Sequence, residues 1–346
     1  MQFIRPDVNL DFIGKRKYAF IFSAILILLS IGTLLYHGGP LYGIDFSGGT
    51  LIQVRFEKPA AIADIKAALN QLNFGQAAVQ QFGEEGATEY LIRTDLAGLT
   101  DQGFNETLRR SLSEATGSAV EIRRVEMVGP QVGKDLRAKA LQALFFALLF
   151  ITVYISGRFE LKWLLSAVLA VALIGAVYVF SLFQVSIPVL ILVALLVTLA
   201  LFWFLNLRYA MGAIVALIHD VTITVGVFSL FNKEFTLPII AALLTIIGYS
   251  LNDTIIVFDR IRENTKKLHK NPLATIINRS INETLSRTLL TSLTTLVVVI
   301  TLFVLGGGII HDFAFALLVG VLIGTYSSVY VASPILLAWQ RRSSAG

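Results

Sequence analysis

The sequence contains no cysteine and only four histidines. Without cysteine there can be no disulfide, iron–sulfur cluster, thiolate zinc site or cysteine nucleophile, and so few histidines leave little for a metal centre. Charged residues are also scarce, at 15% of 346 residues, whereas hydrophobic residues make up 55%. With a mean hydropathy of +0.75, the chain lies far outside the range of soluble globular domains. We therefore interpret it as a polytopic membrane protein.

The net charge of +5 does not indicate a nucleic-acid-binding protein, because the basic residues lie at the ends of apolar blocks. Lys and Arg accumulate in short cytoplasmic loops, which predicts about eight spans with both termini in the cytoplasm. The predicted order is a cytoplasmic N-terminus (1–17), a first transmembrane helix (18–36), an external region (37–137), a second transmembrane helix (138–160), a further apolar helix pair (161–209), four helices in 210–339 with a cytoplasmic loop at 259–287, and a cytoplasmic C-terminus (340–346).

The external region is the one stretch with the character of a soluble domain. Residues 50–56 alternate like a half-buried strand, and residues 60–72 place apolar side chains on one helical face. The full pattern predicts a small α+β domain of order β-α-β-β-α-β, the ferredoxin-like plan. It carries no recognisable catalytic constellation, so we expect a binding or lever module rather than an enzyme, with no cofactor.

The segment "YGIDFSGGT", Tyr42–Thr50, precedes this domain. Its glycine pair suggests a phosphate loop, but the lysine and the hydroxyl residue of that motif are missing. A tight turn explains the pattern better: we expect Gly48 and Gly49 to permit positive φ and Asp45 to hydrogen-bond the backbone of the same turn.

Polar residues inside the apolar blocks need a separate explanation, because a carboxylate at the bilayer centre costs at least ~2.5 kcal/mol. Asn252 and Asp253 lie in the block 237–258, and Arg287 begins the following, antiparallel block. A desolvated aspartate with an intermittent arginine partner can load and release a proton. A static Asp253–Arg287 pair, or interhelical hydrogen bonds that only fix packing, explain the same residues.

Asp220 presents the same two alternatives, since a direct role in proton relay competes with a packing hydrogen bond to His219, Thr222 or Thr224. In the last block Gly320 and Gly324 form G-x-x-x-G, which predicts a face for close helix packing.

Several long motifs, in this order along the chain, closely resemble the SecF family, the smaller half of the bacterial SecDF protein-export factor. The motifs are "YGIDFSGGT", "VEMVGPQVGKDLR", "ALIHDVTITVGVFSLF", "IIGYSLNDTIIVFDRIREN" and "SRTLLTSLTT". The resemblance implies an RND-superfamily protein of the bacterial inner membrane that pairs with SecD and associates with SecYEG and the small subunit YajC. It further implies use of the proton gradient to pull SecA-engaged preproteins outward.

The resemblance also assigns residues. The family's essential intramembrane carboxylate falls on Asp253, with Asn252 as a supporting residue, and its functional arginine falls on Arg287. The family signature turn falls on Gly43, Asp45, Gly48 and Gly49.

One departure from the family pattern concerns the middle of the chain. In the family "SGRFE" leads within a few residues into "GAIVALIHD", whereas here 161–209 separates them. This implies an RND-like bundle expanded from six spans to about eight. Two other functions stay open: a small-molecule/proton antiporter component, which predicts two large loops and more spans, and a passive scaffold of the translocase.

Overall fold

The computed structural model describes residues 9–72, 74, 77–82, 88–94, 102–160, 163–181 and 187–343. Contacts divide the chain into two compact units. The sheet unit comprises Tyr42–Lys139 together with the short segment Glu234–Leu237, and the helical unit comprises the rest. The range Tyr42–Lys139 is close to the predicted range 37–137, but no pattern in the sequence indicates that the four residues leading into α9 (Leu237–Lys267) belong to the same unit.

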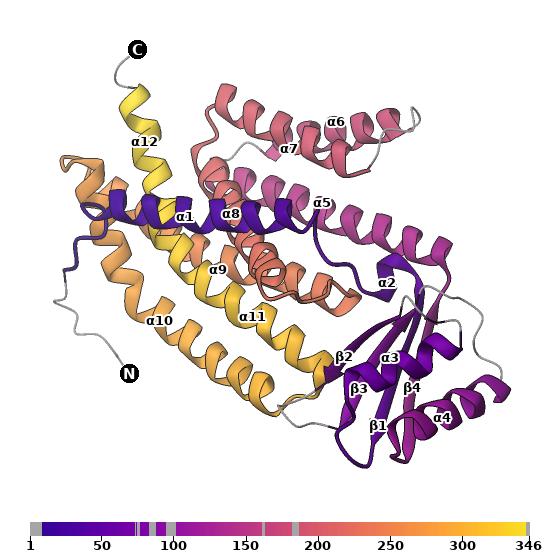
Figure 1. Cartoon of the computed structure of the whole chain (residues 1–346). Coiled ribbons are helices and arrows are strands. Elements are labelled where there is room, and N and C mark those ends of the chain that lie inside the picture. Colours follow the sequence, from indigo (N-terminus) through magenta and orange to yellow (C-terminus); the bar gives the residue numbers. More distant parts are fainter. Residues whose placement is uncertain are drawn as a thin grey trace. The chain divides into compact units, whose positions relative to one another are not determined.

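The sheet unit is built on a four-stranded antiparallel sheet of order β2-β3-β1-β4. Both long helices of the unit cover one face of this sheet (Figure 1). Reversed, the strand order reads 4-1-3-2, and with the chain order β-α-β-β-α-β it confirms the predicted ferredoxin-like plan. The elements are α2 (Ile44–Ser47), β1 (Gly49–Phe56), α3 (Ile62–Gln71), β2 (Ala78–Phe82), β3 (Glu89–Thr94), α4 (Gln102–Thr116) and β4 (Val120–Val128).

The core of the sheet unit follows from the two-residue period of its strands and the 3.6-residue period of its helices. Alternate residues Ile52, Val54 and Phe56 of β1 are fully buried because successive strand side chains point to opposite faces. Leu108 and Leu112, one helical turn apart on α4, close over them. The predicted apolar face of α3 is also buried except at its ends, where Ile62 is exposed and Leu72 is only partly covered.

The helical unit contains six helices that are long and apolar enough to cross a membrane, among the described residues. The apolar windows of α6 and α7 (163–179 and 192–204) are shorter, so the eight-span count stays a prediction for that pair. The helices are α1 (Arg16–Tyr36), α5 (Pro130–Glu160), α6 (Trp163–Ser181), α7 (Ile187–Phe204), α8 (Arg208–Leu230), α9 (Leu237–Lys267), α10 (Leu273–Leu305), α11 (Gly308–Ser327), the π-helix η1 (Ser328–Ala332) and α12 (Ser333–Ser343).

Two predicted boundaries differ from the structure. Helix α5 begins at Pro130 rather than near 138, because proline is favoured in the first turn and hydropathy marks only the apolar part of a helix. The predicted cytoplasmic loop 259–287 is mostly helical, with only 268–272 between α9 and α10. The polar end of α9 and the polar start of α10 are joined by hydrogen bonds: the Asn264 side-chain amide donates to Ser280 Oγ at 3.0 Å and to Glu283 Oε2 at 2.8 Å.

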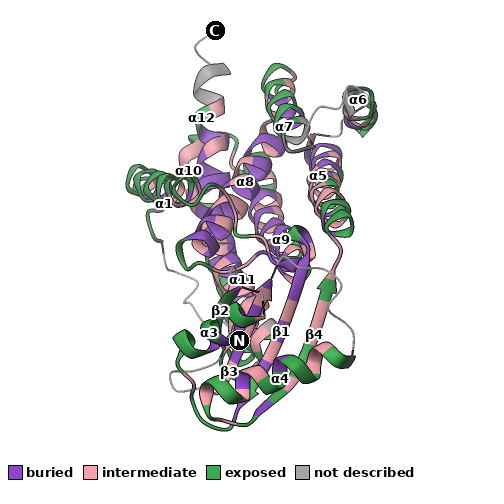
Figure 2. Ribbon diagram, turned by 45° about the vertical axis from the view of Figure 1, so that its right-hand side comes forward, coloured by how far each residue is buried: buried purple, intermediate pink, exposed green. Residues whose placement is uncertain are grey.

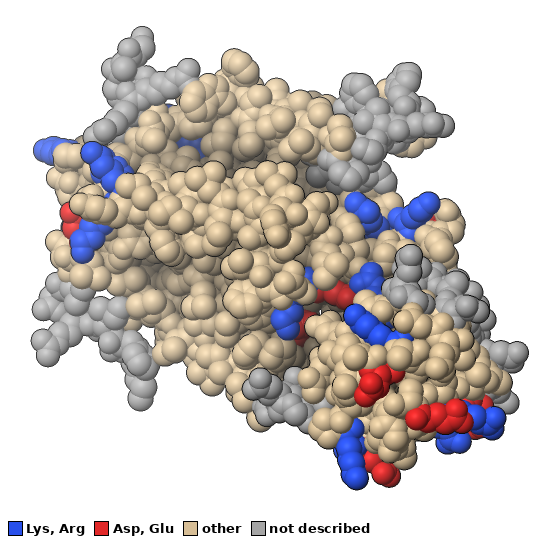
Figure 3. Space-filling model, in the orientation of Figure 1, with Lys and Arg blue, Asp and Glu red and all other residues tan. Residues whose placement is uncertain are grey.

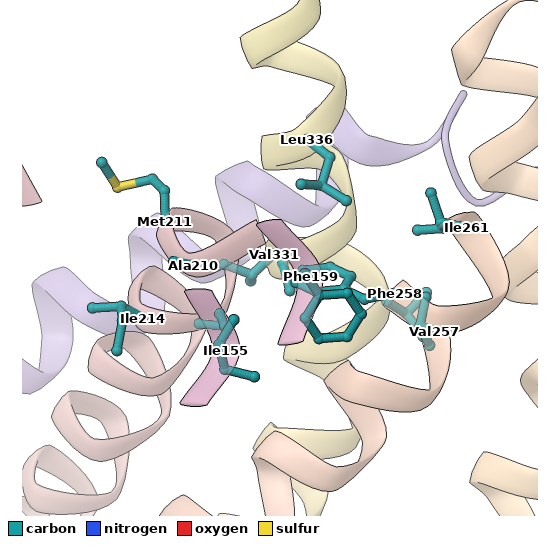
Figure 4. Close-up of a cluster of buried hydrophobic side chains, with 14 of the residues drawn as sticks. Ile155, Phe159, Ala210, Met211, Ile214, Val257, Phe258, Ile261, Val331 and Leu336 are labelled. Carbon is teal, nitrogen blue, oxygen red and sulfur yellow. The ribbon is translucent and has the colours of Figure 1, made fainter. Parts of the chain in front are cut away.

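The main apolar cluster of the helical unit gathers around α8 (Figure 4). Small residues such as Ala210, Ala213 and Ala216 are fully buried there, and an added Cβ at Gly212 would lie 3.0 Å from the carbonyl oxygen of Ala332 in η1. By contrast, only 17% of the apolar windows of α1 and α10 is buried, and Figure 2 shows α1 exposed along most of its length. The view in Figure 3 shows a broad surface of the helical unit without charged side chains.

Candidate functional site: two buried carboxylates among the helices

Asp253 lies on α9 and is 1% exposed. Within the described residues its one side-chain hydrogen-bond contact is with Ser292 of α10, whose Oγ is 3.4 Å from Asp253 Oδ2. The same Ser292 hydroxyl is 2.7 Å from Thr325 Oγ1, and Thr325 uses its own hydrogen on the carbonyl of Val321. Because a serine has one hydrogen, Ser292 gives it to Thr325 at the shorter distance. An anion at Asp253 therefore lacks a full hydrogen bond within the described part of the chain.

Arg287 is not bonded to Asp253. The arginine side chain is exposed and forms no ion pair among the described residues, although its charge is near enough to act on the Asp253 carboxylate. The static pair considered from the sequence is thus absent from this structure. Asn252 is also exposed, because adjacent residues of a helix do not share a face, so it does not support Asp253 directly.

Asp220 on α8 has the opposite surroundings, although it is equally buried at 0% exposure. Its Oδ2 accepts the hydroxyls of Ser250 on α9, at 2.5 Å, and of Ser327 on α11, at 2.7 Å. Its Oδ1 lies 2.8 Å from Nδ1 of His219. Of the neighbours considered from the sequence, His219 therefore contacts the carboxylate, whereas Thr224 donates to the backbone carbonyl of Asp220.

A chain of hydrogen bonds continues from His219 to α1. His219 Nε2 lies 3.0 Å from Ser23 Oγ, and Ser23 Oγ lies 3.0 Å from Tyr326 Oη. Tyr326 then donates to the carbonyl oxygen of Ala19 at 2.7 Å. Side chains of α1, α8, α9 and α11 thus meet in one buried polar network around Asp220, which no local sequence pattern could have revealed.

The two carboxylates share a helix contact. An added Cβ at Gly320 would lie 2.3 Å from Ile246 of α9, and one at Gly324 would lie 2.9 Å from Ser250. The G-x-x-x-G pair of α11 therefore lies directly against α9, where small residues allow close approach. This contact brings Ser327 and Thr325 of α11 to the two sites.

The glycine pair of the signature turn has the predicted conformation, with φ of +76° at Gly48 and +113° at Gly49. Space is limited as well, because a Cβ at Gly48 would lie 2.8 Å from Cα of Pro130. The expected role of Asp45 is wrong: its carboxylate accepts the backbone N–H of Leu237 at 2.8 Å rather than bonding its own turn. Residue Leu237 begins α9, so Asp45 binds an unsatisfied donor at the start of that helix.

The segment Glu234–Leu237, here called the strap, forms further bonds with this turn. The Gly43 N–H donates to the Phe235 carbonyl at 2.8 Å, and Phe235 itself is only 4% exposed. Arg93 of β3 pairs with Glu234 at 2.8 Å and also donates to the Tyr42 carbonyl at 2.6 Å. A Cβ at Gly43 would lie 2.8 Å from Thr236, which explains the glycine there.

Family models match most of the chain. "Protein export membrane protein SecD/SecF, C-terminal" matches residues 107–202 and 197–342, and "SecD/SecF GG Motif" matches residues 39–60, which include the signature turn. The chain belongs to the SecF family. The two stretches of the first match meet at 197–202, inside the apolar pair 161–209 that departs from the motif spacing.

Curated members of the SecF family resemble the chain over nearly its whole length. The protein translocase subunit SecF of Magnetococcus marinus is 46% identical over 341 residues, covering 97% of this chain and 94% of the relative. That of Vibrio alginolyticus is 42% identical over 340 residues, covering 97% and 91%. The chain is accordingly a multi-pass membrane protein of the protein-translocation machinery.

Solved structures agree with the SecF assignment. The crystal structure of SecDF, a translocon-associated membrane protein from Thermus thermophilus, is 33% identical with a TM-score of 0.71. A second crystal structure, of SecDF in a "Super-membrane-facing form", is 34% identical with a TM-score of 0.58. Each match covers 98% of this chain but only 40% of the SecDF chain, so this chain spans less than half of the solved protein.

Proposed function

We propose that this chain couples proton movement across the bacterial inner membrane to the outward pulling of preproteins. The observation that supports this most is Asp253, a fully buried carboxyl group within an apolar span. An ionised carboxylate without donors is costly in such surroundings, which is the setting in which a carboxyl group exchanges a proton. The proposed working cycle is binding of a proton by Asp253 from one side of the membrane and its release to the other.

A partner chain is part of the proposal. The chain corresponds to 40% of the solved SecDF chain, and SecD is the proposed source of the remainder. Asn252 and Arg287 expose polar side chains on membrane-spanning helices, where contact with lipid is unfavourable. We therefore place them against SecD rather than lipid, with Arg287 supplying a mobile counter-charge to Asp253. SecYEG, YajC and SecA-engaged preproteins complete the proposed assembly.

The strap gives the proposal a mechanical link. Helix α9 begins in the strap at Leu237 and carries Asp253 16 residues later (253 − 237), about 24 Å along a helix. A shift of α9 on proton binding at Asp253 therefore acts on the Asp45–Leu237 and Gly43–Phe235 bonds of the sheet unit. In this proposal the sheet unit is external, both termini are cytoplasmic, and energy comes from the proton gradient without a cofactor or an enzymatic step.

The decisive experiment measures preprotein transport in membrane vesicles with and without a proton gradient. Asp253→Asn keeps the shape of the side chain but cannot bind a proton, so gradient stimulation should disappear. Asp253→Glu restores a carboxyl group and should restore part of the stimulation. Asp259→Asn, on the same helix but outside the buried site, is the matched control and should behave like the parent chain.

Co-purification with SecD in the same preparations separates coupling from assembly. Full stimulation in the Asp253→Asn variant, with the complex intact, would overturn proton coupling at Asp253 and favour a passive scaffold.

A further inference from the structure

The His219–Asp220 pair is a buried titratable cluster that the proposed mechanism at Asp253 does not use. Both residues are almost inaccessible, at 3% and 0% exposure. The number of hydrogens that the cluster holds can be counted from its contacts, because each donor has a fixed number of hydrogens.

The count begins at the far end of the network. The Ala19 carbonyl can only accept, so the single hydrogen of Tyr326 is used there. The contact between Tyr326 and Ser23 at 3.0 Å must then use the single hydrogen of Ser23. Consequently the contact between Ser23 and His219 at 3.0 Å requires a hydrogen on Nε2 of the histidine.

The count ends at the carboxylate. The 2.8 Å contact between His219 Nδ1 and Asp220 Oδ1 needs one more hydrogen, which is on either the ring nitrogen or the carboxyl oxygen. Ser250 and Ser327 supply their own hydrogens to Oδ2 and add none to this contact. A neutral histidine beside an ionised aspartate has one hydrogen between the two side chains, whereas the geometry requires two.

We propose that His219 and Asp220 together form a second proton-binding site, which holds one extra proton as a pair without net charge. A charge argument leads to the same conclusion as the hydrogen count. Without that proton the pair carries a buried net charge of −1, and among the described residues no Lys or Arg contacts it. Such an unpaired buried charge is strongly unfavourable. The other side chains that face the pair are Ser23 of α1, Ser250 of α9, and Tyr326 and Ser327 of α11, and of these four the tyrosine alone is of a titratable type.

Proton binding at the pair acts on helix contacts. The proton comes from water on one side of the membrane and returns to water, and the charge of the pair changes between −1 and 0. A chain of hydrogen bonds runs from Asp220 through His219, Ser23 and Tyr326 to the Ala19 carbonyl. When the proton leaves, one bond of this chain loses its hydrogen, so the attachment of α1 to α8 and α11 is weakened. The pair is thus a proton-dependent contact between helices as well as a site. Its use in export rests on the proposed function, whereas its occupancy by a proton does not.

The test is nitrogen-15 NMR of the full chain in lipid nanodiscs. Replacing His37, His269 and His311 by glutamine leaves His219 as the one histidine. Infrared spectra of the same samples test Asp220: a carboxylic-acid band that disappears in Asp220→Asn shows that this carboxyl group is protonated. Two protonated ring nitrogens at neutral pH support the proposal. A hydrogen on Nε2 alone together with a protonated Asp220 supports it equally. A hydrogen on Nδ1 alone, with Nε2 bare, overturns it.

A second variant tests the network itself. Ser23→Ala removes the acceptor of the Nε2 hydrogen, so the nitrogen-15 resonance of His219 Nε2 should shift relative to the parent chain; an unchanged resonance contradicts the proposed geometry. The same spectra in an Asp253→Asn chain separate the two proposals. If the His219–Asp220 pair keeps its proton in the Asp253→Asn chain, this inference is supported, whether or not that chain still shows gradient-stimulated transport.

Discussion

Asp220 and Asp253 are two buried carboxyl groups on neighbouring helices, yet they differ in almost every contact. Asp220 receives two hydroxyl hydrogens and faces a histidine, whereas Asp253 has one hydrogen-bond contact, at 3.4 Å, within the described part of the chain. Burial alone therefore does not say what an intramembrane aspartate does. A carboxyl group with few partners can change its protonation with little rearrangement, while one at the centre of a network changes the contacts of several helices when it does.

The largest expected difference between the two sites is in stability. Asp220→Ala leaves the hydroxyls of Ser250 and Ser327 and the ring of His219 buried without their acceptor, and removal of one member of a buried pair costs about 3–5 kcal/mol. Asp253→Ala leaves no strong donor unpaired, so we expect a loss of ~1 kcal/mol or less. Thermal unfolding of the purified proteins in detergent measures both. Equal losses would remove the contrast between the sites.

The helix contact shared by both sites should be the next most sensitive. Gly320→Ala puts a Cβ against Ile246, which lies 2.3 Å away, and such overpacking costs about 1–3 kcal/mol. Gly248→Ala on α9 is the matched control because an added Cβ there meets nothing within 4 Å. We expect that control to be neutral or slightly stabilising. If both changes are neutral in the unfolding assay, α9 and α11 are not closely packed at this point.

A third carboxylate extends the comparison to the sheet unit. Asp45 accepts a single backbone N–H, at the first residue of α9, much as a capping residue does. Asp45→Ala should cost about 1 kcal/mol and should raise protease cleavage within the strap. Asp64→Ala, in the first turn of α3 without a capping hydrogen bond, is the control, with an expected loss of only a few tenths of a kcal/mol. Unchanged cleavage in Asp45→Ala would mean that other bonds hold the strap.

The smallest expected effect comes from removing a single serine hydroxyl beside each of the two buried carboxyl groups, Asp220 and Asp253. Ser250→Ala removes a 2.5 Å hydrogen bond to Asp220, and interhelical hydrogen bonds in membranes contribute about 0.6 kcal/mol on average. Ser292→Ala removes a 2.7 Å bond between two neutral hydroxyls and the long contact to Asp253, whereas the bond lost in Ser250→Ala is a short one to a carboxylate and is therefore stronger, so the loss for Ser292→Ala should be smaller. Unfolding of the two variants side by side decides the order. A larger loss for Ser292→Ala would mean that Asp253 is better satisfied than its distances indicate.

Much of the fold could be predicted because its signals are local. The alternation in β1 and the apolar length of α8 reflect how each element is buried, and both are visible in short windows of sequence. The position of Asp253 inside a long apolar helix could be predicted in the same way, from its distance to the end of an apolar block.

The missed features depend on contacts between distant segments. Asp45 and Leu237 are 192 residues apart, and no local pattern at either residue indicates the other. A static Asp253–Arg287 pair is absent for a related reason: similar depth on antiparallel helices does not fix the rotation of each helix, and Arg287 is on the exposed side of α10. Intermittent pairing of the two residues stays a prediction. Asp220 could be noted from the sequence, but its network required four helices to be placed.

The strap also determines how this protein can be divided. A fragment consisting of residues 42–139 would keep the sheet and both of its helices but would lack Glu234–Leu237. Gly43 and Asp45 would then lose their hydrogen-bond partners Phe235 and Leu237. The remaining chain would uncover Phe235, which is buried in the intact protein. The sheet unit is therefore completed by four residues from a distant part of the sequence, and a tetrapeptide with the sequence of Glu234–Leu237, supplied separately, is the natural complement for the isolated fragment.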